Sequence, residues 1–300
     1  MTIHGYEIVS DWKNSYCGKV AVAVKGGKRY CLKKYMTYVA PFDDGVLDTK
    51  TFLHNKKAFE DFVATRKANN ARLRSISGFD NVIPVPCEEF VDGHYYMEVS
   101  KLIENIVSMA ELRFVLDAMP FESKRLLMKI ITSGLVGLHS IGIVHGDLSI
   151  ENVVVYQGTM GNYAAKLTGF SSYFSVGTIP DDFFAVSEYQ SPELAKYSLT
   201  EEENKEMGEG ITEKSDIFSL GLLFHFFLVG DLPEPVSLTE KLQRRKDQGK
   251  RIYPWLALNH GGQLQISDQI QNDKIRLLIA DMLKVDPNDR PSAKAVFKRL

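Results

Sequence analysis

The residues best suited to chemistry lie in a short polar stretch between two apolar runs, Ile143-Val144 and Val153-Val154-Val155. Within this stretch Asp147 and Asn152 are five positions apart, on a segment expected to form a loop that leads into a valine-rich strand. From such a loop a carboxylate and an amide can project toward one point, where they can accept a proton and exchange hydrogen bonds. His145, two residues before the aspartate, belongs to the apolar side.

The segment from His145 to Asn152, His-Gly-Asp-Leu-Ser-Ile-Glu-Asn, resembles the catalytic loop of protein kinases, H-R-D-L-x-x-x-N. The resemblance implies that Asp147 accepts or orients the proton of a substrate hydroxyl, and that Asn152 holds a magnesium ion on the nucleotide phosphates. It also implies that Val154, on the following strand, contacts the nucleotide. A pattern this short is weak by itself, so the interpretation depends on the segments that must position these residues.

Alternating apolar and polar residues predict three antiparallel strands near the N-terminus, at residues 6–9, 20–24 and 29–33. On the third of these, Tyr30-Cys31-Leu32-Lys33 resembles the kinase V-A-I-K segment, whose lysine holds the α- and β-phosphates of ATP. Alternation places Cys31 and Lys33 on one face of the strand, as that role requires. The simpler alternative is that Lys33 is a solvated lysine on an edge strand.

The connection before the second strand carries part of the kinase glycine-rich loop, G-x-G-x-x-G-x-V. Gly18 and Val20 match its last glycine and its valine, while Lys13 and Ser15 stand at the positions of the first two glycines. Glycine lets backbone amides approach a phosphate closely, and Cβ atoms at both positions hinder that approach. The resemblance therefore implies nucleotide contacts from Gly18 and Val20 without a tight phosphate cradle.

A long helix is expected over residues 49–76, where aromatic side chains recur at helical spacing. Kinases keep a glutamate on the corresponding helix that pairs with the strand lysine. Here the matching position is Asn69, or Asn70 with a one-residue slip. Glu60 lies more than two helical turns earlier, too far to substitute at 1.5 Å of rise per residue. Lys33 is therefore expected to have no carboxylate partner from this helix.

Two further strands are expected, around residues 82–85 and 94–99. The second resembles the strand that runs into the kinase hinge. This implies that Met97 is the gatekeeper and that Glu98 and Val99 offer backbone groups to an adenine. Because backbone contacts tolerate almost any side chain, this assignment depends on strand position and not on residue chemistry.

Farther along, Gly169-Phe170-Ser171 stands where kinases carry D-F-G, whose aspartate is the main magnesium ligand. The replacement leaves Asn152, which has no charge, as the metal ligand that the resemblance implies. Nucleotide binding is therefore expected to be weak and to change little when magnesium is added. Restoring the carboxylate with Gly169→Asp is expected to recover metal dependence, because Asn152 is already in place.

Three charged residues in the C-terminal half also match the kinase pattern. Ser191-Pro192-Glu193 resembles A-P-E, and Asp216 resembles the aspartate of D-x-W-S-x-G that fastens the catalytic-loop backbone. Arg290 follows in Asp-Pro-Asn-Asp-Arg-Pro and is implied to form a buried ion pair with Glu193. This set in this order separates the chain from small-molecule phosphotransferases and RIO-type kinases, which share similar catalytic loops.

Composition narrows the classes of partner. A formal net charge of −2 in 300 residues gives no reason to expect nucleic acid or an anionic membrane as a partner. The three cysteines form no C-x-x-C pair and no apolar run reaches about 18 residues, so a cytoplasmic protein is expected. Residues 243–251 form a basic patch, whose simplest interpretation is a solvated helix end. The alternative is a docking site for an acidic partner.

The resemblance covers nearly the whole chain and implies an α+β, bilobal protein-kinase-like fold. A small β-rich lobe with one long helix is expected over residues 1–99, and a larger, mainly helical lobe over residues 100–300. The departures favour a pseudokinase, a module for a protein partner or protein substrate that binds ATP weakly and without Mg²⁺. The alternative is an unconventional serine/threonine kinase that transfers the γ-phosphate of ATP, with Asp147 orienting the acceptor hydroxyl.

Overall fold

The computed structural model describes residues 1–15, 17–76, 82–158, 160–169, 173–179, 187–199 and 211–300. They form two compact units, Met1–Glu104 and Asn105–Leu300. The boundary expected at residue 99 falls inside strand β7, Tyr95–Lys101, which stays whole because it is hydrogen-bonded on both sides. The α+β class is confirmed, with a sheet and one long helix in the first unit and mainly helices in the second. Phe170 and Ser171 lie outside the described residues.

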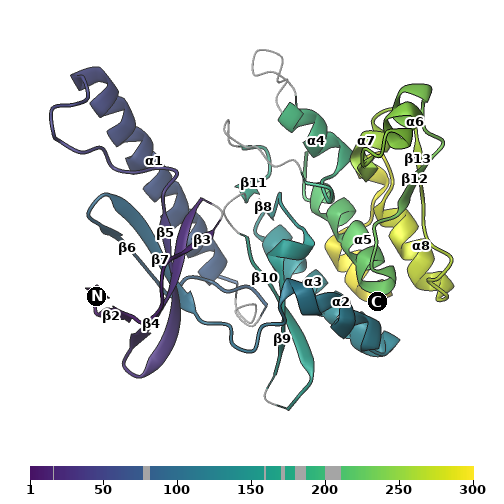
Figure 1. Ribbon diagram of the computed structural model, residues 1–300, viewed down its shortest axis with the longest axis horizontal. Helices are drawn as coiled ribbons and strands as arrows, with labels where there is room; N and C mark the ends of the chain where they lie inside the picture. Colours follow the sequence, from purple (N-terminus) through teal and green to yellow (C-terminus); the bar gives the residue numbers. More distant parts are fainter. Residues whose placement is uncertain (16, 77–81, 159, 170–172, 180–186, 200–210) are drawn as a thin grey trace. The chain divides into compact units, whose positions relative to one another are not determined.

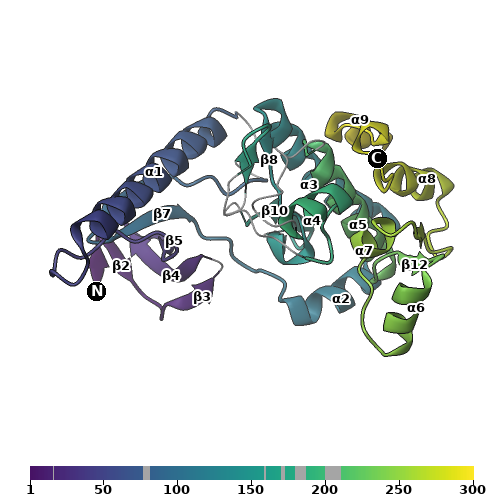
Figure 2. The same cartoon turned by 90° about the horizontal axis from the view of Figure 1, so that it is seen from above.

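The first unit is built on an antiparallel sheet with the strand order β1-β2-β4-β5-β7-β6, and β3 pairs with β4 at one side (Figure 1). Its other strands are β1 Thr2–Ile3, β2 Tyr6–Ile8, β3 Lys13–Ser15, β4 Gly18–Lys25, β5 Lys28–Tyr35 and β6 Glu88–Asp92. One face of the sheet carries a hydrophobic core that includes Leu32, Met97 and Val99. The opposite face of β5 and β7 meets helix α1, Thr49–Arg74 (Figure 2).

Helix α1 begins where the side chain of Asp48 accepts a hydrogen bond from the backbone N–H of Thr51 at 3.0 Å. The helix expected over residues 49–76 is thereby confirmed to within two residues. Its buried side chains are Phe59, Arg66, Asn70 and Leu73, whose spacing places them on one face. Two of these four are polar, so the helix meets the sheet through hydrogen bonds as well as apolar contacts.

The strand expected at residues 82–85 was wrong. The strand in this region is β6, which starts at Glu88 and pairs with β7. Pro84 and Pro86 lack the backbone N–H that a sheet ladder requires, which explains why the pairing starts only after them.

The second unit is centred on α5, Lys214–Val229, in which twelve of the sixteen residues are buried. A helix that is buried nearly all round belongs to the middle of a core. The other helices are α2 Met109–Ala118, α3 Phe121–Ser140, α4 Pro192–Leu199, α6 Glu240–Asp247, α7 Pro254–Leu258, α8 Asp273–Met282 and α9 Ala293–Arg299. No described helix is both long and apolar enough to cross a membrane.

Short strand pairs complete the second unit. They are β8 Ile143–Val144 with β11 Phe174–Ser175, β9 Val153–Gln157 with β10 Tyr163–Leu167, and β12 Glu234–Val236 with β13 Gln263–Gln265. The polar loop that carries Asp147 runs from β8 to β9, and it contains one 3₁₀ turn at Ile150–Asn152. Helix α3 packs against both α5 and β10, so the loop is anchored to the centre of this unit (Figures 1 and 2).

Candidate functional site

Asp216, near the start of α5, holds the backbone of the loop between β8 and β9. Its carboxylate accepts hydrogen bonds from the backbone N–H groups of His145 at 2.8 Å and Gly146 at 3.0 Å. It is also 2.9 Å from Nε2 of His139. Burial by itself raises the pKa of Asp216, but His139 and the loop groups outweigh it and hold the pKa below its ordinary value. The expected tie between Asp216 and the loop backbone is confirmed.

His145 links the loop to the segment before Gly169. Its Nε2 is 2.7 Å from the carbonyl oxygen of Thr168, and its Nδ1 is 3.4 Å from the backbone N–H of Asp147. A carbonyl only accepts and an N–H only donates, so these partners place the imidazole proton on Nε2. The backbone N–H of Thr168 donates to the carbonyl of Asn152 at 2.8 Å, which closes a second link.

Asp147 and Asn152, the pair expected to act together, are in direct contact. The Asn152 Nδ2 donates to the Asp147 carboxylate at 2.9 Å and to the Asp147 carbonyl oxygen at 2.7 Å. Burial raises the pKa of Asp147 above its ordinary value, against the opposing effects of His145 and of the Asn152 amide. The carboxylate is therefore a better proton acceptor than an exposed aspartate, and its direction is set by Asn152.

Gly169, which follows β10, packs against the Asn152 side chain of the loop. Its backbone φ is +80°, in the left-handed region that favours glycine. A Cβ atom built on Gly169 would overlap the side-chain amide of Asn152. Any residue other than glycine at this position therefore requires the Asn152 side chain to move. An aspartate at this position requires the same movement of Asn152, so the recovery of metal dependence by Gly169→Asp stays a prediction.

The donor set of the loop does not fit a magnesium ion. Magnesium prefers an octahedral shell with one or two carboxylates and phosphate oxygens. The carboxylate of Asp147 already accepts a hydrogen bond from Asn152, and position 169 supplies none. Across the described ranges, no group of three or more His, Cys, Asp or Glu residues is arranged to hold a metal.

The fit between Gly169 and Asn152 predicts a difference between two glycine variants. Gly177 has nearly the same backbone angle, φ +82°, but a Cβ atom there meets nothing within 4 Å. Gly177→Ala is expected to cost only the left-handed backbone penalty, about 1–2 kcal/mol. Gly169→Ala is expected to lower the free energy of unfolding further, because it also displaces Asn152. Urea unfolding of the two variants measures this, and equal losses would contradict the packing described here.

In the first unit, the strand register gathers most of the residues expected to contact nucleotide. Val20 on β4 lies opposite Lys33 on β5, and Lys33 lies opposite Glu98 on β7. Directly paired residues share a face, and Gly18 and Cys31 lie on that face by alternation. The expected cluster of Gly18, Val20, Cys31 and Lys33 is therefore present on the sheet face that meets α1.

Met97 and Val99 lie on the other face. Both are buried in the core cluster with Leu32, at 1% and 0% exposure. Their backbones are within the paired part of β7, where the Val99 carbonyl accepts from the N–H of Cys87 at 2.8 Å. Their side chains therefore point away from the face that carries Lys33, because one step along a strand moves a side chain to the opposite face. The gatekeeper role of Met97 and the backbone contact of Val99 with an adenine stay predictions.

The close approach of β4 and β5 explains why position 18 is a glycine. A Cβ atom at this position would overlap the carbonyl oxygen of Lys34 on the neighbouring strand. Upstream of it, Lys13–Ser15 form β3 and pair directly with Gly18–Val20 as a tight hairpin. The segment that resembles a glycine-rich loop is thus a hairpin whose glycine permits close strand approach.

Helix α1 presents an arginine and an amide where the family pattern has a glutamate. Arg66 donates to Glu98 at 2.8 Å, and both side chains are only 7% exposed. Asn70, one of the two amides expected at the position of the family glutamate, donates to the same carboxylate at 2.8 Å. Glu60 is exposed on the helix surface. Arg66 was not predicted as a site residue, and the signal for it in the sequence is its position on the same helical face as Phe59.

Glu98 is the carboxylate that acts on Lys33 from the strand. Burial and, to a lesser extent, Arg66 lower the pKa of Lys33 to about 8, against the opposing effect of Glu98. Lys33 also lies over the ring of Tyr35, with 4.6 Å from Nζ to the ring centroid. The charges around Lys33 are therefore reversed relative to the kinase pattern. The helix carries a cation, Arg66, and the sheet carries the carboxylate, Glu98.

This pKa gives a prediction for the reactivity of Lys33. The amine is mainly protonated below pH 8 and mainly neutral above it, so its acylation rate is expected to level off above a midpoint near the pKa of about 8. Mass-spectrometric labelling with an acylating reagent across a pH series measures this midpoint. A rate that keeps rising toward the ordinary lysine pKa of 10.5 would contradict the environment described for Lys33.

The ion pair expected between Glu193 and Arg290 is confirmed. Arg290 Nη1 donates to Glu193 Oε1 at 2.7 Å, and Nη2 donates to Oε2 at 2.9 Å. The arginine side chain is fully buried, and it also donates to the carbonyl oxygens of Lys284, Val285 and Lys214. A fork-to-fork pair with every remaining donor used is the arrangement in which a buried charge is stable.

Comparison with known proteins agrees with these features. A family model described as the protein kinase domain matches residues 83–299. The chain is 25% identical over 254 residues to the meiosis-specific serine/threonine-protein kinase mek1 of Schizosaccharomyces pombe, a match over 83% of this chain and 50% of that protein. It is 27% identical over 233 residues to the serine/threonine-protein kinase RAD53 of Saccharomyces cerevisiae, over 76% and 26% of the two proteins.

A third relative is the phosphorylase b kinase gamma catalytic chain, liver/testis isoform, of Rattus norvegicus. It is 25% identical over 243 residues, covering 78% of this chain and 53% of the relative. The chain therefore spans about half or less of the length of these three relatives. The family match begins at residue 83. It therefore leaves out β3, which carries Lys13 and Ser15, and α1, which carries Asn70.

Proposed function

Because the chain belongs to the protein kinase domain family, we propose that it is a pseudokinase, a kinase-fold binding module that holds ATP weakly and without magnesium. The observation that carries this proposal is Gly169 itself, which supplies no carboxylate and at which a Cβ atom would overlap the Asn152 side chain. Phosphoryl transfer depends on metal ions that bridge the phosphates and neutralise the developing charge. Loss of a single preorganised charged or polar group typically lowers the rate by about 10²-fold or more.

The first unit supports weak nucleotide binding of a different kind. Lys33 supplies one cation for a phosphate, on the same sheet face as Val20. Its carboxylate neighbour Glu98 is shared with Arg66 and Asn70. The hairpin of β3 and β4 uses its backbone groups in strand pairing, so it offers no open cradle of amides to a phosphate.

One observation favours an active serine/threonine kinase as the second candidate. Asp147 keeps its bond to Asn152, and the loop is fixed through Asp216 as a catalytic loop requires. An aspartate with a raised pKa is suited to accept the proton of an acceptor hydroxyl. In this candidate Lys33 supplies the positive charge that the metal supplies in other kinases.

A transfer assay separates the two candidates. The protein is incubated with γ-labelled ATP, a mixture of protein substrates and either magnesium or manganese, and Asp147→Asn serves as the matched control. The proposed function predicts that label transfer is no greater than for Asp147→Asn with either metal. Metal-dependent transfer that disappears in Asp147→Asn would overturn the pseudokinase and establish the kinase.

A further inference from the structure

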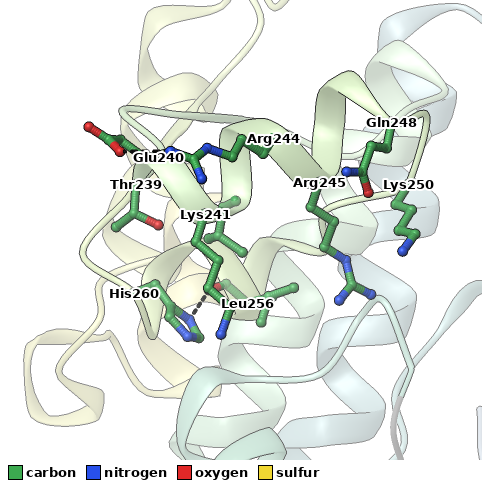
Figure 3. A pocket seen from close by; sticks show the side chains of 10 residues that line it. Thr239, Glu240, Lys241, Arg244, Arg245, Gln248, Lys250, Leu256 and His260 are labelled. Atoms are coloured by element: carbon green, nitrogen blue, oxygen red, sulfur yellow. Dashed lines mark hydrogen bonds and ion pairs between the residues drawn. The ribbon is translucent and has the colours of Figure 1, made fainter.

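The basic segment around α6 lines a hollow of about 630 Å³ on the second unit. Its floor includes Leu242 of α6 and Leu256 of α7, which belong to one hydrophobic cluster. Its rim carries Lys241, Arg245 and Lys250 (Figure 3). Lys241 and Arg245 are four residues apart on one helix and therefore lie on the same face.

The charge balance of this segment sets the hollow apart from an ordinary helix end. Residues 240–251 contain six basic and two acidic side chains, in a chain whose net charge is −2. Three of the six cations have partners, since Arg244 pairs with Glu240, Lys246 with Glu234 and Arg251 with Glu188. The remaining three make no ion pair within the described ranges of the chain, and all three line the hollow.

We propose that this hollow is a docking site for an acidic segment of a partner protein, a short peptide with adjacent carboxylate or phosphate-bearing side chains. The three cations on the rim provide charge complementarity, and the apolar floor accommodates a hydrophobic neighbour in the same peptide. A short segment fits better than a large polyanion, because the positive charge is confined to one hollow. The solvated helix end, the simpler interpretation of this sequence, leaves the hollow and its unshared cations unexplained.

The inference gives a partner class to the proposed binding module and rests on that proposed function. Its test is independent, because peptide binding is measured whether or not phosphate transfer occurs. Fluorescence anisotropy is measured with a labelled peptide that contains leucine beside a run of glutamates, and with the same peptide carrying glutamines. Binding of the glutamate peptide is expected, and it is expected to weaken steeply between about 0.05 M and about 0.5 M salt.

Two double variants with equal changes in net charge decide the outcome. K241Q/R245Q removes two rim cations, whereas K246Q/R251Q removes two cations that are already paired. The first is expected to weaken peptide binding by about tenfold, and the second to leave it nearly unchanged. Equal weakening by both variants, equal binding of the glutamine peptide or no binding at low salt would overturn the proposal. So would tighter binding of phosphatidylserine vesicles or single-stranded RNA that K241Q/R245Q abolishes.

Discussion

Arg290→Ala is expected to lower the free energy of unfolding by about 3–5 kcal/mol, the usual cost of removing one partner from a buried ion pair. Among the described residues, the substitution leaves the Glu193 carboxylate with the hydroxyl of Ser215 as its hydrogen-bond donor, and it removes the donors to three backbone carbonyl oxygens. It also opens a cavity beside Phe218, whose ring centroid lies 5.0 Å from the guanidinium carbon of Arg290. Urea unfolding monitored by tryptophan fluorescence measures the loss.

Arg299→Ala is the matched control for this prediction. Arg299 pairs with Asp281 at 2.8 Å, but the two side chains are 40% and 43% exposed. Exposed pairs contribute roughly 0–1 kcal/mol, so this variant is expected to unfold almost like the unmodified protein. If Arg290→Ala lost no more stability than Arg299→Ala, the buried pair would not have the structural role assigned to it.

Glu98→Ala is expected to have a similar effect on the first unit, about 3–5 kcal/mol. The carboxylate accepts hydrogen bonds from Arg66, Asn70 and the hydroxyl of Tyr35, the last at 2.7 Å. Without it Arg66 is a buried cation that faces a second cation, Lys33, with no carboxylate between them. The unfolding transition of the first unit, followed by hydrogen exchange of β5 and β7, measures the loss.

The control for Glu98 is Glu104→Ala in the same unit. Glu104 pairs with Arg29 at 3.2 Å and is 57% exposed, so its loss is expected to cost less than about 1 kcal/mol.

The pH dependence of stability gives a second check on Glu98. Burial raises the pKa of Glu98, but Arg66 and the hydrogen bonds outweigh it and hold the pKa below its ordinary value. Its contribution is therefore present at neutral pH and is lost as the pH falls through the folded-state pKa. Wild-type stability that is no more acid-sensitive than that of Glu98→Gln would contradict the network.

The ion pair and the hydrogen bonds between charged residues far apart in the sequence could be predicted. The sheet face on which each strand residue lies could not. Glu193, Asp216 and Arg290 each follow a local pattern that fixes both the residue and its partner, and the structure places all three as expected. The face on which Met97 lies could not be predicted, because a shift of one residue reverses the face of a strand. Nothing in the pattern of residues 94–99 determines which face meets α1.

Two other features depend on contacts that a sequence pattern does not contain. Helical periodicity predicts that Arg66 lies on the buried face of α1, but it does not identify a partner. The partner, Glu98, follows only from the register of β7. The departure at Gly169 was found from the sequence, but its consequence was not. The overlap between a Cβ atom at position 169 and the Asn152 amide is a contact between residues on different segments, which the sequence pattern does not contain.

The measurement that tests the central claim most directly is a thermal-shift series with ATP, in the presence of magnesium or of a chelator. A ligand that binds the folded state raises its stability by mass action, and coupled ligands raise the affinity of each other by the same factor. With Gly169 and the Asn152 amide as described, ATP is expected to give a small shift that is the same with magnesium and with the chelator. A stabilising shift from ATP that appears only with magnesium would contradict the account.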